Sequence, residues 1–78
     1  MKVKITKPDC TVYDGEAKLV QLPGTGGLFE ILNNHAPIIS SLARGSLRLI
    51  DNADQEHNFD IRGGVVKGQR NDLLILVQ

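Results

Sequence analysis

The sequence predicts an all-β fold: a β-sandwich or flattened barrel of about eight to ten short strands, formed by a single domain over residues 1–78. Turn-forming residues recur at short and regular spacing, and the segments between them alternate apolar with polar side chains. No window of about ten residues carries a helical stripe of apolar residues. A chain of 78 residues leaves no room for a second domain, and the sequence shows no linker or internal repeat.

The turns are marked by glycine, asparagine, aspartate and proline. Glycine and asparagine supply the positive φ that tight turns require, and proline fixes φ at the start of a turn. The segments between the turns have the length of ordinary strands. In chain order the turn signals are Pro8-Asp9, Asp14-Gly15, 23–27, Asn33-Asn34, Arg44-Gly45, Asp51-Asn52, Gly63-Gly64 and Asn71-Asp72.

The strand segments show a period of two, which places one set of side chains in the core and the other set in solvent. On the first segment, Lys2, Lys4 and Thr6 form the polar side. The apolar sides of the three clearest segments are formed by Val3 with Ile5, Leu47 with Leu49, and Phe59 with Ile61.

The segment 36–44 is the one place where a helix competes with a strand. Pro37 suits the first turn of a helix and the start of a strand equally well. The adjacent pair Ile38-Ile39 is β-branched, and β-branched residues favour strands. We therefore predict a strand here.

A glycine pair, Gly63-Gly64, separates two strand-like segments. Glycine within a strand pattern often marks a bulge or a sharp bend, where φ is positive or another backbone approaches closely. The pair therefore predicts a bend at which the chain passes from one sheet to the other.

Two segments are apolar on both faces, 73–77 (Leu-Leu-Ile-Leu-Val) and, almost entirely, 28–32 (Leu-Phe-Glu-Ile-Leu). One face of each segment points into the core. In so small a domain, the other face either stays exposed and marks an interaction site, or belongs to a central strand that loops cover on both sides. The pattern alone does not decide between these two interpretations.

Composition argues against several classes of function. Nine basic residues balance nine acidic ones, so there is no basic stripe for nucleic acid, and three aromatic residues are too few for a base-stacking platform. The single cysteine, Cys10, allows neither an internal disulfide nor a cysteine zinc site, and we expect a buried thiol. Without a long apolar run or a signal peptide, we expect a soluble protein with no direct membrane insertion.

The stretch 22–39 is rich in glycine but does not match a nucleotide-binding loop. Leu28 and Phe29 follow Gly27, where a phosphate-binding loop needs lysine and then serine or threonine. In the dinucleotide pattern counted from Gly24, the sixth position holds Phe29 instead of glycine. We therefore predict a glycine-rich hairpin loop.

No group of residues predicts catalysis, a cofactor site or a metal site. We expect His57 to be solvated, and His35 to lie in a loop, where it bonds to local backbone or contacts a partner. Asp51 and Asp54 are expected to lie exposed in a hairpin turn. These expectations point to a protein that is not an enzyme.

A set of short motifs follows one order and spacing along almost the whole chain. The motifs are Asp14-Gly15-Glu16, Leu22-Pro23-Gly24-Thr25 with Gly27, Phe29, Ile31-Leu32, His35-Ala36-Pro37, Gly45-Ser46-Leu47-Arg48-Leu49 and Arg62-Gly63-Gly64-Val65-Val66. Taken together, they resemble the N-terminal β-sandwich domain of the epsilon subunit of F-type ATP synthases, which is called delta in mitochondria.

This resemblance implies a non-catalytic subunit of the central stalk, which packs on the gamma subunit, sits against the membrane-embedded c-ring and supports the coupling of proton transport to ATP synthesis. It implies a peripheral location on the cytoplasmic face of a bacterial inner membrane, with no cofactor. As ring-side contacts we predict Gly24, Thr25, Gly27, Leu28, Glu30, Asn33, Asn34 and His35. As gamma-side contacts we predict Ala36, Pro37, Ile38, Ile39, Ser41, Gly63, Gly64, Leu74 and Leu76.

The sequence departs from the family pattern at three places. Leu28, Glu30 and Asn33-Asn34 stand where the family commonly has glutamate, glycine and Pro-Gly. Asparagine tolerates left-handed backbone as glycine does, so we expect the turn to persist. Glu30 shares a strand side with position 28, and we expect it to contact a polar loop of a partner.

Family members usually continue into a C-terminal helical hairpin, which carries inhibitory movement and, in some members, ATP binding. The sequence ends at Gln78, so we expect neither property of these 78 residues. The alternative function is a free-standing β-sandwich module that binds a peptide or a glycan. That alternative accounts for the strands but not for the ordered motifs.

Overall fold

The computed structural model describes all 78 residues, and they form strands and turns only. No helix long and apolar enough to cross a bilayer is present. The all-β prediction is confirmed, as is the strand interpretation of the segment around Pro37. The eight strands are β1 (Lys2–Thr6), β2 (Thr11–Gly24), β3 (Gly27–Leu32), β4 (His35–Leu42), β5 (Gly45–Asp51), β6 (Glu56–Ile61), β7 (Gly64–Arg70) and β8 (Asp72–Val77).

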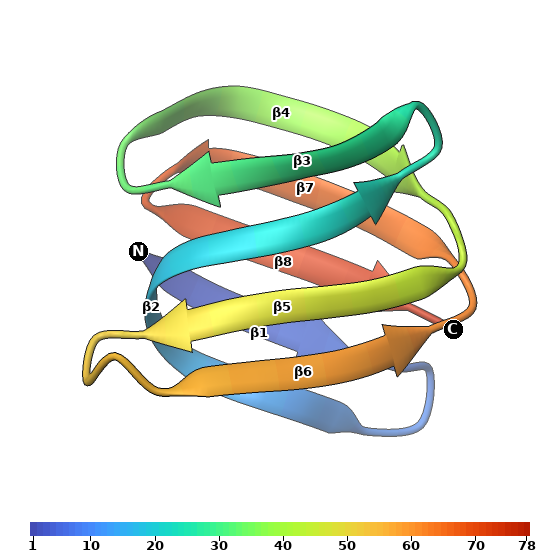
Figure 1. Cartoon of the computed structure of the whole chain (residues 1–78), viewed down its shortest axis with the longest axis horizontal. Coiled ribbons are helices and arrows are strands. Elements are labelled where there is room, and N and C mark those ends of the chain that lie inside the picture. Colours follow the sequence, from blue (N-terminus) through green and yellow to red (C-terminus); the bar gives the residue numbers. More distant parts are fainter.

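The strands form two layers that face each other across an apolar core (Figure 1). Sheet I joins β3, the second half of β2, β5 and β6 through antiparallel pairs. Sheet II joins the first half of β2 to β1, β8, β7 and β4. The pairing of β1 with β8 is parallel and links the strands nearest the two ends of the chain. A single pairing of Gly24 with Leu42 connects the layers at one corner.

Strand β2 belongs to both sheets. Its first half pairs with β1, and its second half lies between β3 and β5, with a register shift between Ala17 and Leu19 where it changes sheet. The turn predicted at Asp14-Gly15 is wrong, because the ladder to β1 holds both residues in an extended strand. Glycine permits turn geometry without imposing it.

The predicted inward residues lie in the core, except that Phe59 is only half-buried and packs against it. No polar or charged residue is buried, so alternation along the strands alone separates the core from the surface. Each fully buried leucine or isoleucine contributes about 1.5–3 kcal/mol relative to an exposed one. The buried apolar residues are Met1, Val3, Ile5, Ala17, Val20, Leu22, Ile31, Leu42, Leu47, Leu49, Ile61, Val66, Leu73, Ile75 and Val77.

The glycine pair Gly63-Gly64 carries the chain from β6 in sheet I to β7 in sheet II, which confirms the predicted bend. Their φ angles are 151° and 158°. A Cβ on Gly64 would collide with the carbonyl oxygen of Leu76 and lie 3.0 Å from Cα of Val77. The crossing therefore requires glycine, because the backbone of β8 leaves no room for a side chain there.

The thiol of Cys10 is exposed in the turn between β1 and β2, so the expectation of a buried thiol is wrong. The turn is held by the backbone, where the N–H of Lys7 donates to the carbonyl oxygen of Cys10 at 2.7 Å. A short turn at the sheet edge leaves this side chain nothing to pack against.

Candidate functional site

The outer surface of sheet II carries an exposed apolar face. We call Ile39, Val65, Lys67, Leu74 and Leu76 the sheet II face. The four apolar members are between 37% and 73% exposed. They are contiguous, because Lys67 lies opposite both Ile39 and Leu74, and Val65 lies opposite Leu76. The interpretation in which loops cover the second face of segment 73–77 is therefore wrong.

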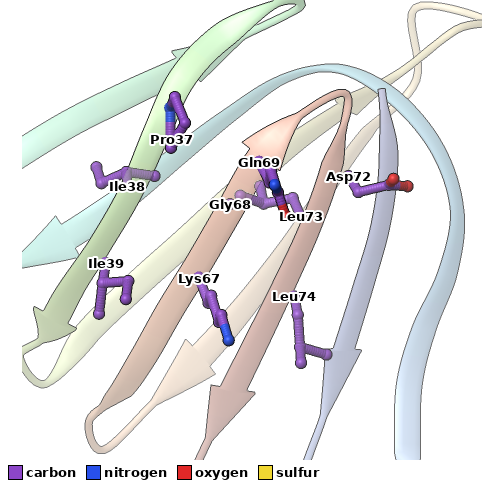
Figure 2. Close-up of a pocket in the computed structure, with 9 residues that line it drawn as sticks. All are labelled: Pro37, Ile38, Ile39, Lys67, Gly68, Gln69, Asp72, Leu73 and Leu74. Atoms are coloured by element: carbon purple, nitrogen blue, oxygen red, sulfur yellow. The ribbon is translucent and has the colours of Figure 1, made fainter.

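A groove of about 640 Å³ hollows this surface between β4 and the β7–β8 pair (Figure 2). His35 pairs with Arg70 and Ile38 with Gly68, so β4 carries one extra residue and bulges at positions 36–37. Pro37 sits in that bulge, where its missing N–H breaks no ladder bond. Figure 2 shows the apolar side chains of Pro37 and Ile39 on one side and of Leu74 on the other. The groove thus combines apolar side chains on both sides with the polar groups of Lys67, Gln69 and Asp72.

The outer surface of sheet I is polar over β5 and β6, whereas β3 also exposes apolar side chains there. Arg48 Nε lies 2.8 Å from Oε1 of Glu56, and Asn58 donates to Oε2 of the same carboxylate at 3.0 Å. Hydrogen bonding and charge together raise the pKa of Arg48 and lower the pKa of Glu56. Gln21 pairs with both Arg48 and Glu30 in the ladder. The charges of Arg48 and Glu56 are therefore matched within the chain.

The predicted ring-side residues separate into two groups at opposite ends of β3 (Figure 1). Gly24, Thr25 and Gly27 form the hairpin between β2 and β3, and Gly27 takes a positive φ of 127° there. The group 33–35 lies at the far end, about 20 Å away for a six-residue strand. Leu28, between the groups, shares the outer side of β3 with Glu30, as predicted. A compact partner surface at one end cannot reach the other.

The asparagines of the β3–β4 turn are engaged by their own chain. Asn34 takes a positive φ of 62°, so the substitution for glycine keeps the turn as expected. Its N–H donates to Oδ1 of Asn71, and Nδ2 of Asn71 donates back to Oδ1 of Asn34, both at 2.8 Å. Oδ1 of Asn33 accepts a hydrogen bond from the amino group of Met1 at 2.6 Å. His35 bonds to the adjacent carbonyl of Ala36, which is the local role considered above.

The predicted gamma-side residues divide into surface and structural members. Ser41 lies opposite Val65 at the margin of the sheet II face, and Ala36 is exposed at the bulge. Ile38 points inward and packs against the core. Gly63 and Gly64 shape the crossing between the sheets. Ile39, Leu74 and Leu76 are therefore the predicted residues that the fold brings together in one exposed face.

Asp51 and His57 form a pair that sequence reasoning missed. Nε2 of His57 lies 2.8 Å from Oδ2 of Asp51, so the prediction of a solvated histidine is wrong. Oδ1 of Asp51 also accepts the N–H groups of Ala53 and Gln55 at 2.9 Å, so this aspartate organises the turn. The hydrogen bond from His57, followed by the one from Gln55, lowers the pKa of Asp51. The signal for this pair is that both residues flank one short turn.

Tyr13 covers the seam between β2 and β6. Its ring contacts His57 and Phe59 edge-on, with centroids 5.4 and 6.3 Å away. Its hydroxyl donates to the carbonyl oxygen of Glu16 at 2.9 Å. Burial raises the pKa of Tyr13, and the carboxylate of Asp51 raises it further. No group of three or more histidine, cysteine or acidic residues gathers to hold a metal ion.

Comparison with known proteins places the chain among ATP synthase subunits. It is 34% identical to an ATP synthase epsilon chain of Chlorobium limicola, over 99% of this chain and 88% of that protein. It is 38% identical to the epsilon chain of Thermosynechococcus vestitus, of whose length it covers 55%. The chain therefore spans most of one relative and about half of the other.

Solved structures share the fold. A chain in the structure of the Euglena gracilis mitochondrial ATP synthase, described as OSCP/F1/c-ring, superposes with a TM-score of 0.90 at 18% identity, over 96% of this chain and 48% of that one. A chain in the central stalk/c-ring structure of the Tetrahymena thermophila enzyme gives 0.84 at 19% identity, over 100% of this chain and 63% of that one.

The family described as "ATP synthase, Delta/Epsilon chain, beta-sandwich domain" matches residues 1–78. The match covers both sheets and the connections between them, which the alternative of an unrelated peptide- or glycan-binding module does not explain. The chain therefore belongs to the ATP synthase delta/epsilon family, as its β-sandwich domain.

Proposed function

We propose that the chain acts in the central stalk of an F-type ATP synthase, where it links the gamma subunit to the c-ring and supports the coupling of proton transport to ATP synthesis. The observation that carries the proposal is the exposed apolar face of sheet II on a domain of this family. Exposed contiguous apolar surface on a small domain marks a protein–protein contact.

The sheet II face is the proposed contact with gamma. It combines four large exposed apolar side chains with a groove that widens the contact. Fully buried centres of interfaces are more apolar than ordinary surface and are depleted in charge. The part of sheet I formed by β5 and β6, where Arg48, Glu56 and Asn58 lie, lacks that composition.

The β2–β3 hairpin and the adjoining outer side of β3 form the proposed contact with the c-ring. Leu28 is 68% exposed, and the carboxylate of Glu30 makes no ion pair, so both are available to a polar loop with apolar neighbours. The far turn is a poorer candidate, because Asn33 and Asn34 already use their amide groups within the chain. We therefore restrict the ring-side proposal to positions 24–30.

The proposed location is peripheral, on the cytoplasmic face of a bacterial inner membrane, and held there by the other subunits. The proposed role is non-catalytic, with no nucleotide bound by these 78 residues. The glycine-rich stretch supports this, because it forms a tight hairpin with no lysine near its tip and no helix behind it.

Co-purification tests the proposal as a whole. A tagged chain added to membranes depleted of epsilon should recover gamma and c subunits and should restore proton-coupled ATP synthesis. Recovery of the chain without ATP synthase subunits, or of an unrelated glycoprotein, would contradict the proposal.

Cysteine cross-linking tests the orientation. With Cys10→Ser as background, Glu30→Cys should form a disulfide with a cysteine placed in the polar loop of the c subunit. Asn34→Cys, at the opposite end of β3, is the matched control and should not. Efficient cross-linking of the control alone would place the ring at the other end.

A further inference from the structure

We propose that the surface of gamma that covers the sheet II face presents a carboxylate to Lys67, surrounded by apolar side chains. The inference rests on the proposed binding of gamma to this face and specifies the chemistry of the contact. It begins from one feature, the single cation at the centre of an otherwise apolar set of side chains.

The neighbours of Lys67 are apolar on both sides. In the ladder it lies directly opposite Ile39 on β4 and Leu74 on β8, which are 73% and 37% exposed. No carboxylate lies within 4.0 Å of its amine. A partner that covers these two hydrophobic side chains also covers the lysine between them.

The other lysines of the same surface have acidic cross-strand neighbours. Lys2 lies opposite Glu16 on β2 and Asp72 on β8, and Lys4 lies opposite Asp14 on β2 and Leu74 on β8. Such cross-strand pairs are the usual way in which a sheet matches its charges. The acid nearest to Lys67 along β8 is Asp72, which faces Lys2 on one side and Gln69 on the other. None of these three lysines has a carboxylate within 4.0 Å of its amine, but Lys67 alone has no acidic neighbour in the ladder.

Burial of an unmatched charge is costly. An ammonium removed from water without a counter-ion loses its hydration and gains nothing in return, so a stable interface supplies a partner for it. A carboxylate meets this need and also fixes how the two surfaces align, because an apolar face alone tolerates sliding.

The test measures binding of the chain to epsilon-depleted enzyme that contains gamma. Lys67→Met keeps the length of the side chain but removes the charge. Kd should rise roughly 30-fold or more, because the carboxylate of gamma would then be buried without a counter-ion. Lys67→Arg should stay within about tenfold of the original, because it retains the charge. Lys2→Met is the matched control on the same surface, because Lys2 lies between two acids and beside no member of the sheet II face, and it should change Kd by less than about fivefold.

Two readouts separate failure of the inference from failure of the proposed function. Wild-type binding by Lys67→Met, together with loss of binding by Ile39→Asp, would overturn the carboxylate and leave the gamma contact standing. Normal binding by Ile39→Asp, or no binding by the original chain, would overturn both. Thermal unfolding of each variant confirms the fold, and a dimer that Ile39→Asp dissociates would assign the face to a second copy and overturn the inference.

Discussion

The two outer surfaces of the sandwich arise from the same alternation of side chains, yet they differ in how their groups are satisfied. On sheet I, Arg48 and Asn58 both bond to the carboxylate of Glu56. On sheet II, Lys67 has no counter-ion and its neighbours Ile39 and Leu74 remain exposed. The charges of Arg48 and Glu56 are thus matched within the chain, whereas the central lysine of the sheet II face has no partner in this chain.

This difference shows that the exposure of apolar side chains alone does not identify a binding face. Both sheets expose large apolar side chains, for example Leu32 on sheet I and Leu76 on sheet II. The two sheets differ in whether the exposed apolar side chains adjoin one another, and in whether the charged groups among them have counter-ions. The predictions below test this separation, starting with the change that should remove both surfaces at once.

Gly64→Val should have the largest effect. The new side chain would collide with the carbonyl oxygen of Leu76 at the crossing between the sheets, so we expect a loss on the order of 3 kcal/mol or more in the free energy of unfolding. Denaturant unfolding measures the change. Gly26→Val is the control, because a Cβ there meets no atom within 4 Å and the variant should unfold close to the original.

Leu74→Lys and Leu76→Lys should weaken binding to gamma while leaving the fold nearly intact. Each places an unpaired charge in the proposed contact, at a cost of about 2–5 kcal/mol in binding free energy. Both side chains point outward, so the melting temperature should change little. Leu32→Lys supplies the comparison on sheet I and should bind normally. If the two β8 variants unfold the free domain, the face contributes to stability and the contrast between the surfaces fails.

Acid should affect the sheet I side more than the sheet II face. The pKa values of Asp51 and Glu56 are lowered in the fold, so these carboxylates contribute stability above their unfolded pKa values and lose it as pH falls through the folded ones. We therefore expect stability to decline below about pH 4. Asp51→Asn combined with Glu56→Gln should flatten that decline. An unchanged acid profile in unfolding experiments at several pH values would contradict this.

MgATP should have no effect on either surface. The isolated chain offers no lysine-bearing glycine loop and no helix N-terminus for phosphate. Calorimetry with millimolar MgATP should show no saturable heat. A saturable heat of binding would reveal a nucleotide site between or beside the two sheets.

Local patterns predicted much of this arrangement. The period of two placed Val3 with Ile5 and Leu47 with Leu49 on the core side, and the glycine pair identified the crossing between the sheets. The turn wrongly predicted at Asp14-Gly15 shows the limit, because a long-range ladder with β1 overrides a local preference.

The remaining site features depend on contacts that no short window of sequence contains. The two hydrogen bonds between Asn34 and Asn71 join turns that are distant in the chain. The unmatched state of Lys67 emerges only once β4 and β8 lie on either side of it. Asp51 and His57 flank a single turn, so their pairing is predictable from their spacing. The expectation that both side chains face solvent overlooks it.

The parallel pairing of β1 with β8 has a consequence for how the domain assembles in time. Val3 and Ile5 find their partners Leu73 and Ile75 only after nearly all 78 residues have been synthesised. Contacts between such distant segments carry a large entropic cost of loop closure, and β-sandwiches dominated by them fold over milliseconds to seconds. Until β8 emerges, the edge of β1 that pairs with β8 stays open. An open strand edge is a place where another chain can pair, so the addition of β8 also closes a route to aggregation.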